Sequence, residues 1–127
     1  MKRKPSPCPC GSPDYAGCCG RYHGGTPAPD AASLMRSRYS AYVLDLEDYL
    51  LATWHPGTRP GTLDLATDNP KWLGLDIRKH VAESTDSATV EFVARYRIGG
   101  RAHRVHEVSR FVREDGRWFY VDGEFVE

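Results

Sequence analysis

The chain has 127 residues with 17 basic and 17 acidic side chains, and a chain of this length can bury one modest hydrophobic core. The formal net charge of +0 argues against nucleic acid as a partner, because nucleic-acid-binding domains usually carry a basic excess. No apolar run follows the basic N-terminus, and none reaches the roughly 18–20 residues of a membrane span, so we expect a cytoplasmic protein.

All four cysteines lie near the N-terminus, as Cys8, Cys10, Cys18 and Cys19. Four thiols on one short loop are typical of a tetrahedral structural zinc site. His23 is a reserve ligand, in case Cys19 points away from the metal. Disulfide or redox chemistry and inert thiols are the alternatives, although a reducing compartment and the strain of bonding adjacent cysteines disfavour a disulfide.

Two units are predicted, a zinc knuckle over residues 1–25 and an α+β domain over residues 26–127. Asp30 is placed to cap a helix, and apolar residues at three- and four-residue spacing predict one long helix from Ala31 to Ala52. A proline and a glycine then end the helix, and residues 58–70 are predicted to form a loop.

The second half of the domain is predicted to form four strands, over residues 73–81, 89–98, 101–113 and 117–122. The pairs Gly99-Gly100 and Asp115-Gly116 are signals for two-residue hairpin turns. The expected fold class is therefore α+β, with the zinc knuckle followed by a long helix packed on a curved antiparallel sheet.

Motifs along the chain carry resemblances to known families. The pattern Cys8-Pro-Cys10-Gly-Ser…Cys18-Cys19-Gly resembles the SEC-C zinc motif, which implies that these four cysteines are the zinc ligands. Further segments resemble the YchJ-like bacterial family, whose biochemical role is not established: Leu34–Tyr39, Thr53–Pro56, Trp72–Leu75, Ser109–Phe111 and Gly116–Gly123. A helix followed by a curling sheet is also similar to the cone-shaped fold of ketosteroid isomerase and nuclear transport factor two, which hosts enzymes, binding modules and dimerisation modules.

The two hairpin turns predict which residues face one another across the sheet. The predicted opposed pairs include Tyr96–His103, Phe92–Glu107, Phe111–Tyr120 and Ser109–Asp122. These pairs place mostly apolar and aromatic side chains against the helix, together with Glu107, Asp122 and His103. A single bulge would reverse part of this assignment.

Carboxylates that face a core need a partner or a pocket. Arg38 on the predicted helix can pair with Glu107 or Asp122, and a structural ion pair is the simpler interpretation. In the alternative, Glu107 or Asp122 is a general base in a cleft, where burial raises its pKa toward the working pH. His103 on the same face is a third and weaker catalytic candidate.

The foremost functional hypothesis is an interaction or adaptor protein with structural zinc, because the cysteine pattern is specific and no catalytic constellation is recognisable. The alternative is small-molecule binding or enzymatic activity in the cavity of the cone-like domain, and the sequence leaves open whether the chain is an enzyme. We expect zinc as the cofactor, no membrane, and a protein partner, including a second copy of this chain through the sheet. Nucleic-acid binding is the least favoured hypothesis, and its candidate residues are Arg95, Arg97, Arg104 and Arg110.

Overall fold

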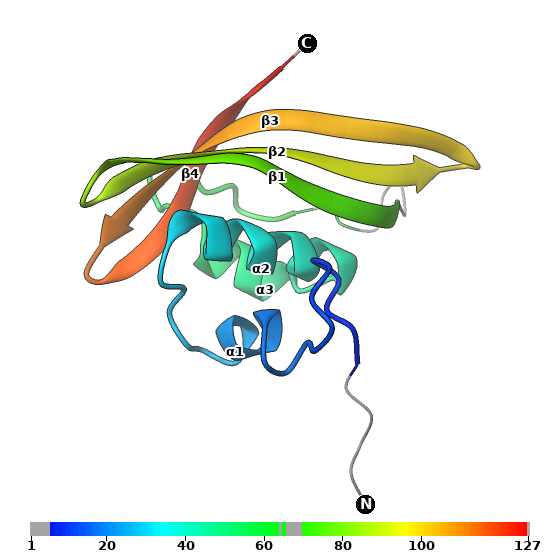
Figure 1. Ribbon diagram of the computed structural model, residues 1–127. Helices are drawn as coiled ribbons and strands as arrows, with labels where there is room; N and C mark the ends of the chain where they lie inside the picture. Colours follow the sequence, from blue (N-terminus) through cyan, green and yellow to red (C-terminus); the bar gives the residue numbers. More distant parts are fainter. Residues whose placement is uncertain (1–5, 64, 66–69, 127) are drawn as a thin grey trace, which may run out of the picture.

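The structure is a computed structural model that describes residues 6–63, 65 and 70–126. A four-stranded sheet is covered on one face by helices (Figure 1). The N-terminal loop that carries the cysteines, called the cysteine loop below, lies together with α1 on the side of α2 away from the sheet. The elements are α1 (Cys19–His23), α2 (Ala31–Val43), α3 (Glu47–Ala52), β1 (Lys71–Ser84), β2 (Ser87–Ile98), β3 (Arg101–Glu114) and β4 (Arg117–Phe125). Part of the loop predicted over residues 58–70 lies outside the described residues. None of the described helices has the length and apolarity that a membrane crossing requires.

The prediction of one long helix from Ala31 to Ala52 is wrong, because a sharp turn separates two shorter helices. Asp45 has φ +57°, and the N–H of Leu46 donates to the Ala41 carbonyl at 2.9 Å. This is the Schellman arrangement, which satisfies the last carbonyl groups of a helix and ends it. Aspartate tolerates the left-handed conformation there because its short polar side chain can hydrogen-bond locally. The start of α2 is as predicted, with Asp30 as its cap.

The sheet is antiparallel in the order β1-β2-β3-β4, and each strand is longer than predicted. Both predicted two-residue turns are present, with positive φ angles at Gly99, Gly100, Asp115 and Gly116, as tight hairpins require. The confirmed pairs are Tyr96–His103, Phe92–Glu107 and Phe111–Tyr120. Turn geometry was therefore sufficient to predict the register near both turns.

The predicted pairing of Ser109 with Asp122 is wrong, because β4 has one extra residue between Tyr120 and Asp122. Arg110 pairs with Asp122 instead, and Ser109 pairs with Gly123. A one-residue bulge moves every residue beyond it to the opposite sheet face. Asp122 consequently lies on the face away from the helices, where it accepts a hydrogen bond from Arg110 Nε at 2.5 Å.

One hydrophobic core joins the cysteine loop to the helices and the sheet. Cys8, Cys10 and Cys19 are buried in the same cluster as Leu34 of α2 and Phe111 of β3. The boundary predicted between residues 25 and 26 crosses this core, so the division into two domains stays a prediction.

Candidate metal centre and interior cavity

Tight turns fold the N-terminal loop back on itself and bring the cysteines together. The N–H of Cys8 donates to the Ser12 carbonyl at 2.8 Å, and the N–H of Gly11 donates to the Cys8 carbonyl at 3.0 Å. Gly11 has φ +111°, a conformation that other residues rarely adopt. The second cysteine pair lies at the start of α1, where a Cβ atom on Gly20 would lie 2.7 Å from the Tyr15 carbonyl oxygen. The turn at Gly11 and the start of α1 at Gly20 thus both depend on glycine.

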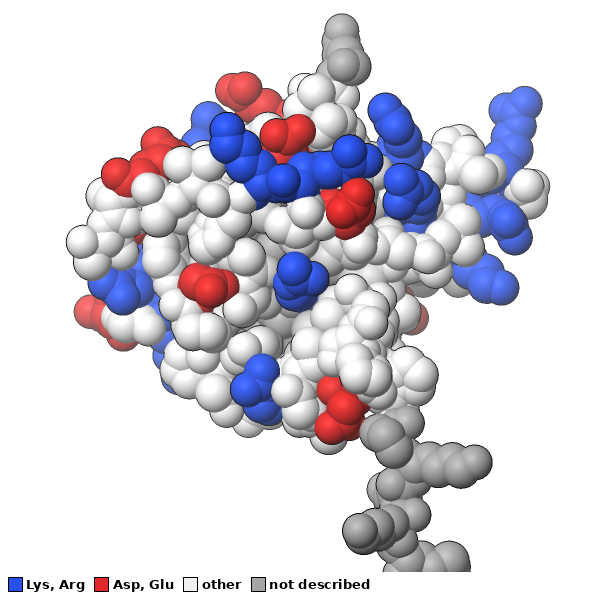
Figure 2. All heavy atoms as spheres, viewed as in Figure 1, with Lys and Arg blue, Asp and Glu red and all other residues white. Residues whose placement is uncertain are grey.

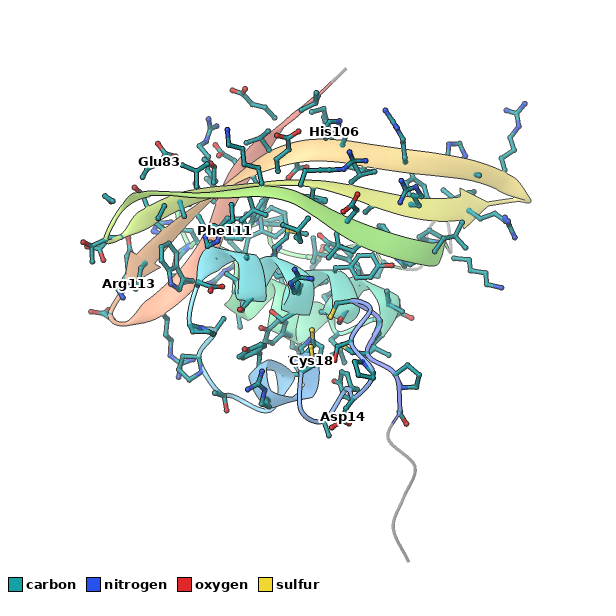
Figure 3. The ribbon with its side chains drawn as sticks, viewed as in Figure 1. Asp14, Cys18, Glu83, His106, Phe111 and Arg113 are labelled. Atoms are coloured by element: carbon teal, nitrogen blue, oxygen red, sulfur yellow. The ribbon has the colours of Figure 1, made fainter. Side chains whose placement is uncertain are left out.

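The sulfur atoms of Cys8, Cys10, Cys18 and Cys19 all lie within 4.8 Å of one another. The Sγ atoms of Cys10 and Cys18 are 3.5 Å apart, and those of Cys18 and Cys19 are 3.9 Å apart. A tetrahedral zinc site with Zn–S bonds of about 2.3 Å places its sulfur atoms about 3.8 Å apart. The cluster, which Figure 3 shows between α1 and α2 at Cys18, can therefore hold a metal ion.

The thiols of this cluster share protons. A hydrogen bond from the Cys19 thiol lowers the pKa of Cys10 to about 5, and the same bond raises the pKa of Cys19. Burial raises the pKa of the Cys18 thiol. Thiols bind metals as thiolates, so a cation between the sulfur atoms would take the place of the remaining protons.

His23, the reserve ligand, has both ring nitrogens engaged elsewhere. Its Nε2 atom donates to the Ser37 carbonyl of α2 at 2.8 Å. In the neutral ring the other nitrogen is then an acceptor, and Nδ1 takes a hydrogen bond from the Tyr15 hydroxyl at 2.6 Å. The ring also packs edge-on against Tyr49 of α3, with 4.6 Å between centroids. His23 thus ties α1 to the two longer helices.

Ser40 of α2 is a further polar group at the cysteine cluster. Its Oγ atom lies 3.5 Å from the Sγ atom of Cys8, and the residue is fully buried. Sequence reasoning missed Ser40, because a single serine within a helix carries no metal-site signal.

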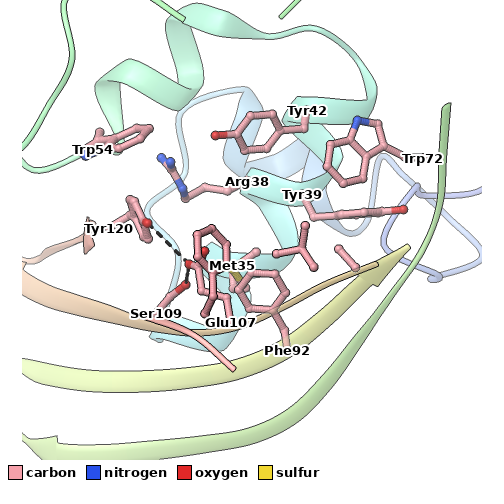
Figure 4. Close-up of a pocket in the computed structure, with 13 residues that line it drawn as sticks. Met35, Arg38, Tyr39, Tyr42, Trp54, Trp72, Phe92, Glu107, Ser109 and Tyr120 are labelled. Atoms are coloured by element: carbon pink, nitrogen blue, oxygen red, sulfur yellow. Dashed lines mark hydrogen bonds between the residues drawn. The ribbon is translucent and has the colours of Figure 1, made fainter. Parts of the chain in front are cut away.

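A cavity of about 250 Å³ lies between α2 and the inner face of the sheet (Figure 4). Its wall is largely aromatic and apolar, and its aromatic members are Tyr39, Tyr42, Trp54, Trp72, Phe92, Tyr120 and Phe125. Phe125 keeps 75% of its surface exposed and so stands at the cavity mouth. The charged lining residues are Arg38 and Glu107. Strand alternation predicts which residues face inward, but not whether they fill the interior or line a space.

Glu107 faces the cavity, as the first hairpin register predicted. Its carboxylate accepts hydrogen bonds from the Ser109 hydroxyl and, at 3.5 Å, from the Tyr120 hydroxyl. A Cβ atom on Gly123 would overlap this carboxylate, so the bulge that places a glycine opposite Ser109 also makes room for Glu107. In the described part of the chain no basic side chain forms an ion pair with Glu107.

The expected ion pair of Arg38 with Glu107 or Asp122 is not found among the described residues. Arg38 is only 3% exposed, and its Nη1 atom donates to the Leu50 carbonyl at 2.8 Å and to Thr53 Oγ1 at 2.7 Å. These neutral acceptors come from α3 and its C-terminal end, so Arg38 fastens α3 to α2. Sequence reasoning had considered carboxylate partners alone.

Aromatic rings complete the surroundings of Arg38. The guanidinium carbon lies 5.1 Å from the ring centre of Trp54 and 4.7 Å from that of Tyr120 (Figure 4). Burial lowers the pKa of Arg38 and raises that of Tyr120. Cation–π attraction offsets part of the cost of burying the charge.

The other two catalytic candidates lie outside the cavity. Asp122 is on the outer face with Arg110, as described above. His103 is exposed and stacks on Tyr96, with 5.3 Å between ring centroids. The structure therefore places Glu107 at the cavity and separates it from Asp122 and His103.

Comparison with known proteins identifies the family of this chain. Residues 30–123 match the family model described as YchJ, middle NTF2-like domain. The chain belongs to the YchJ-like family. Its relatives include UPF0225 proteins of Methylibium petroleiphilum, 59% identical over 97% of this chain and 91% of that protein, and of Bordetella pertussis, 58% identical over 98% of each.

Solved structures extend the similarity to the cysteine loop. The solution structure of RPA3114, a SEC-C motif containing protein from Rhodopseudomonas palustris, has a TM-score of 0.82 and 36% identity, covering 95% of this chain and 99% of that one. The crystal structure of a SEC-C motif containing protein from Psychrobacter arcticus has a TM-score of 0.79 and 29% identity, covering 96% and 84%. The YchJ-like and SEC-C resemblances are thus confirmed, as is the NTF2-like α+β fold, although its helices are shorter than predicted.

Proposed function

We propose that this YchJ-like protein binds a small organic ligand in its interior cavity and carries a structural zinc ion at its four cysteines. Glu107 carries the binding proposal. Its carboxylate lines the cavity, and its hydrogen-bond partners among the described residues are the hydroxyls of Ser109 and Tyr120. Arg38 lines the same cavity but donates to neutral acceptors rather than to Glu107. A carboxylate in a largely aromatic wall without an ion-pair partner loses solvation energy, and a ligand with an N–H or O–H donor would offset that loss.

The donor chemistry of the cysteine cluster supports zinc. Cys8, Cys10, Cys18 and Cys19 would be the ligands, and the ion would link the first turn of the loop to α1. Four protein ligands leave no open position for water, so the ion would be structural rather than catalytic. Iron is also held by four thiolates, so the metal analysis must include it.

The cavity wall suggests the shape of its ligand. Aromatic rings such as Tyr42, Trp54 and Trp72 favour a flat, largely apolar molecule. Glu107 would accept a hydrogen bond from its polar end. The volume of about 250 Å³ is near the lower limit of ligand pockets, which span roughly 300–1,000 Å³, so the proposed ligand has one or two rings.

The zinc proposal is tested by elemental analysis for zinc and iron in protein purified without chelator. We expect one zinc per chain in the parent protein and in His23→Gln, and loss of the metal in Cys19→Ser. Retention of the metal in Cys19→Ser together with its loss in His23→Gln would show that His23 is the fourth ligand. Iron in place of zinc would reject the proposed metal.

The cavity proposal is tested by NMR titration with small planar compounds that carry a donor, such as indole and benzimidazole. Binding should shift the indole N–H signals of Trp54 and Trp72, and native mass spectrometry should detect any molecule that copurifies. Glu107→Gln should weaken binding about tenfold or more, since hydrogen bonds to charged groups contribute about 1.5–3 kcal/mol. Glu91→Gln is the matched control, because Glu91 bonds His106 on the outer face. Equal weakening by both variants, or no shift with any compound, would reject the proposal.

The adaptor role predicted from the sequence stays a prediction, as does general-base catalysis by Glu107. A partner of the cysteine loop would have to contact its exposed side, because Cys8, Cys10 and Cys19 are buried. Capture of a partner by the metal-loaded protein, lost in the metal-free protein, would support the adaptor role.

A further inference from the structure

Basic side chains gather on the outer face of the sheet at the turn end of the β2–β3 hairpin. The members of this basic face are Lys71, Arg95, Arg97 and Arg104, all exposed. The strand register places Lys71 directly opposite Arg97, and Arg95 directly opposite Arg104. Figure 1 shows this end of the hairpin projecting past the helices, and blue side chains dominate the same end of the sheet in Figure 2.

The basic face has no acidic partners in the described part of the chain. The arginines that form ion pairs there are Arg78, Arg110 and Arg113, and none of them belongs to the basic face. The neighbouring carboxylates are engaged elsewhere, Asp76 with Arg78 and Glu91 with His106. Like charges directly opposite one another on a sheet are destabilising. An anion bound across the two opposed pairs would relieve that repulsion.

Aromatic rings lie at the same hairpin end, on the other side of the ribbon. Trp72 and Tyr96 have ring centroids 5.3 Å apart, and Tyr96 is stacked on the exposed ring of His103. The line of rings ends at His103, close in sequence to Arg104. β4 pairs with β3 only from Glu107 onward, so among the described residues the sheet edge at residues 101–105 is free. A nucleic-acid strand that crosses this edge would place phosphates on the guanidinium groups of one face and a base on the exposed ring of the other, which are the two interactions that single-stranded nucleic acids use.

We propose that the basic face binds single-stranded nucleic acid, with phosphates on its four cations and a base on the exposed ring of His103. An acidic peptide could pair with the cations but would leave the face of the His103 ring without a stacking partner, which is why the rings favour nucleic acid. The net charge of +0 does not exclude this surface, because the acidic residues that balance it lie elsewhere in the chain. The basic face lies outside the interior cavity, so this proposal is independent of the small-molecule ligand.

The test is fluorescence anisotropy with a labelled single-stranded uridine oligonucleotide at 50 and 200 mM salt. With four phosphate contacts on a single strand, affinity should fall about 50-fold over that fourfold rise in salt. The triple variant Arg95→Gln, Arg97→Gln, Arg104→Gln should bind at least tenfold more weakly while unfolding at or above the parent temperature, because it removes like charges that face one another. His103→Ala should weaken binding about tenfold and leave the salt dependence unchanged, as expected for a stacking contact.

The matched control is Arg78→Gln, Arg110→Gln, Arg113→Gln, which removes the same charge from ion-paired positions. If this control weakens binding as much as the basic-face variant, the binding is a bulk charge effect and the proposal fails. It also fails if the oligonucleotide does not bind at 50 mM salt. Tighter binding of a glutamate-rich peptide than of the oligonucleotide would assign the face to an acidic protein instead.

Discussion

The Sγ atom of Cys8 lies 3.5 Å from the Oγ atom of Ser40 on α2, so one proposed metal ligand directly contacts the NTF2-like domain. A hydroxyl beside a metal-bound thiolate orients it and stabilises its charge. Because the cysteines also share the core of the helices and the sheet, we expect metal binding and folding of the chain to be linked.

Ser40→Ala should weaken metal binding about tenfold, because partners of metal ligands typically contribute 10–100-fold to affinity. Competition with a chromogenic chelator measures the change. Ser33→Ala is the matched control, since Ser33 lies on the same helix and contributes its backbone N–H, rather than its hydroxyl, to the bond with Asp30. Equal chelator competition for the two variants would contradict a role for Ser40 at the metal.

Removal of the metal should lower the Tm of the whole protein by about 10–20 °C, because the loss of a few kcal/mol shifts a domain of this size by that amount. Circular dichroism of the helices and sheet, recorded with and without chelator, measures the shift. Cys8→Ser should already unfold at the lower temperature and respond little to chelator. An unchanged Tm in the chelated parent protein would mean that the cysteine loop folds independently.

Gly123→Ala should displace the Glu107 carboxylate and lower the free energy of unfolding by about 1–3 kcal/mol, because the added methyl group has no free space. Urea denaturation measures the stability, and the NMR titration measures the effect on ligand binding. Gly74→Ala in β1 is the control, since a Cβ atom there meets nothing within 4 Å. Equal stability of the two variants would show that Glu107 moves at no cost.

Arg38→Met should lower the free energy of unfolding by about 2–4 kcal/mol, although it keeps most of the apolar volume. The loss arises because the Leu50 carbonyl and the Thr53 hydroxyl lose a charged donor in a buried setting. Arg36→Met, at an exposed position of the same helix, should change stability by less than about 0.5 kcal/mol. Chemical denaturation of both variants measures the difference. An Arg38→Met protein as stable as Arg36→Met would refute the role of Arg38 in holding α3 against α2.

The pair of Arg110 and Asp122 should contribute a small stabilisation that disappears in acid. The hydrogen bond from Arg110 holds the pKa of Asp122 below its usual value. A lowered folded-state pKa stabilises the fold above the unfolded value of about 3.9, and the contribution is lost as the pH falls through the folded value. Both side chains are about half exposed, at 51% and 45%, so solvent keeps the effect small.

Asp122→Asn should therefore lower the Tm slightly at neutral pH and leave it unchanged below both pKa values. Thermal scans of parent and variant across the acid range measure this difference. A Tm difference that grows as the pH falls would have the wrong sign for this ion pair.

Features that depend on neighbours along the chain were predictable from the sequence alone. The cysteine pattern indicated the cluster because its spacing allows only a short loop to join the two pairs. Gly99 and Gly100 indicated the first hairpin and thereby placed Glu107 on the inner face, because a two-residue turn sets the register of both strands. Helical periodicity also placed Arg38 beside the buried stripe of the helix, and the residue is buried.

Only the tertiary structure decided what those residues contact. One extra residue in β4 carries Asp122 to the outer face and brings Gly123 opposite Ser109, and strand alternation does not reveal such a bulge. Asp45 divides the predicted helix, which lets α3 return and offer the Leu50 carbonyl to Arg38. A buried polar group finds its hydrogen-bond partners on segments that are distant in the chain. The local sequence pattern allows several such partners, and only the packing of the whole chain decides which one is in contact.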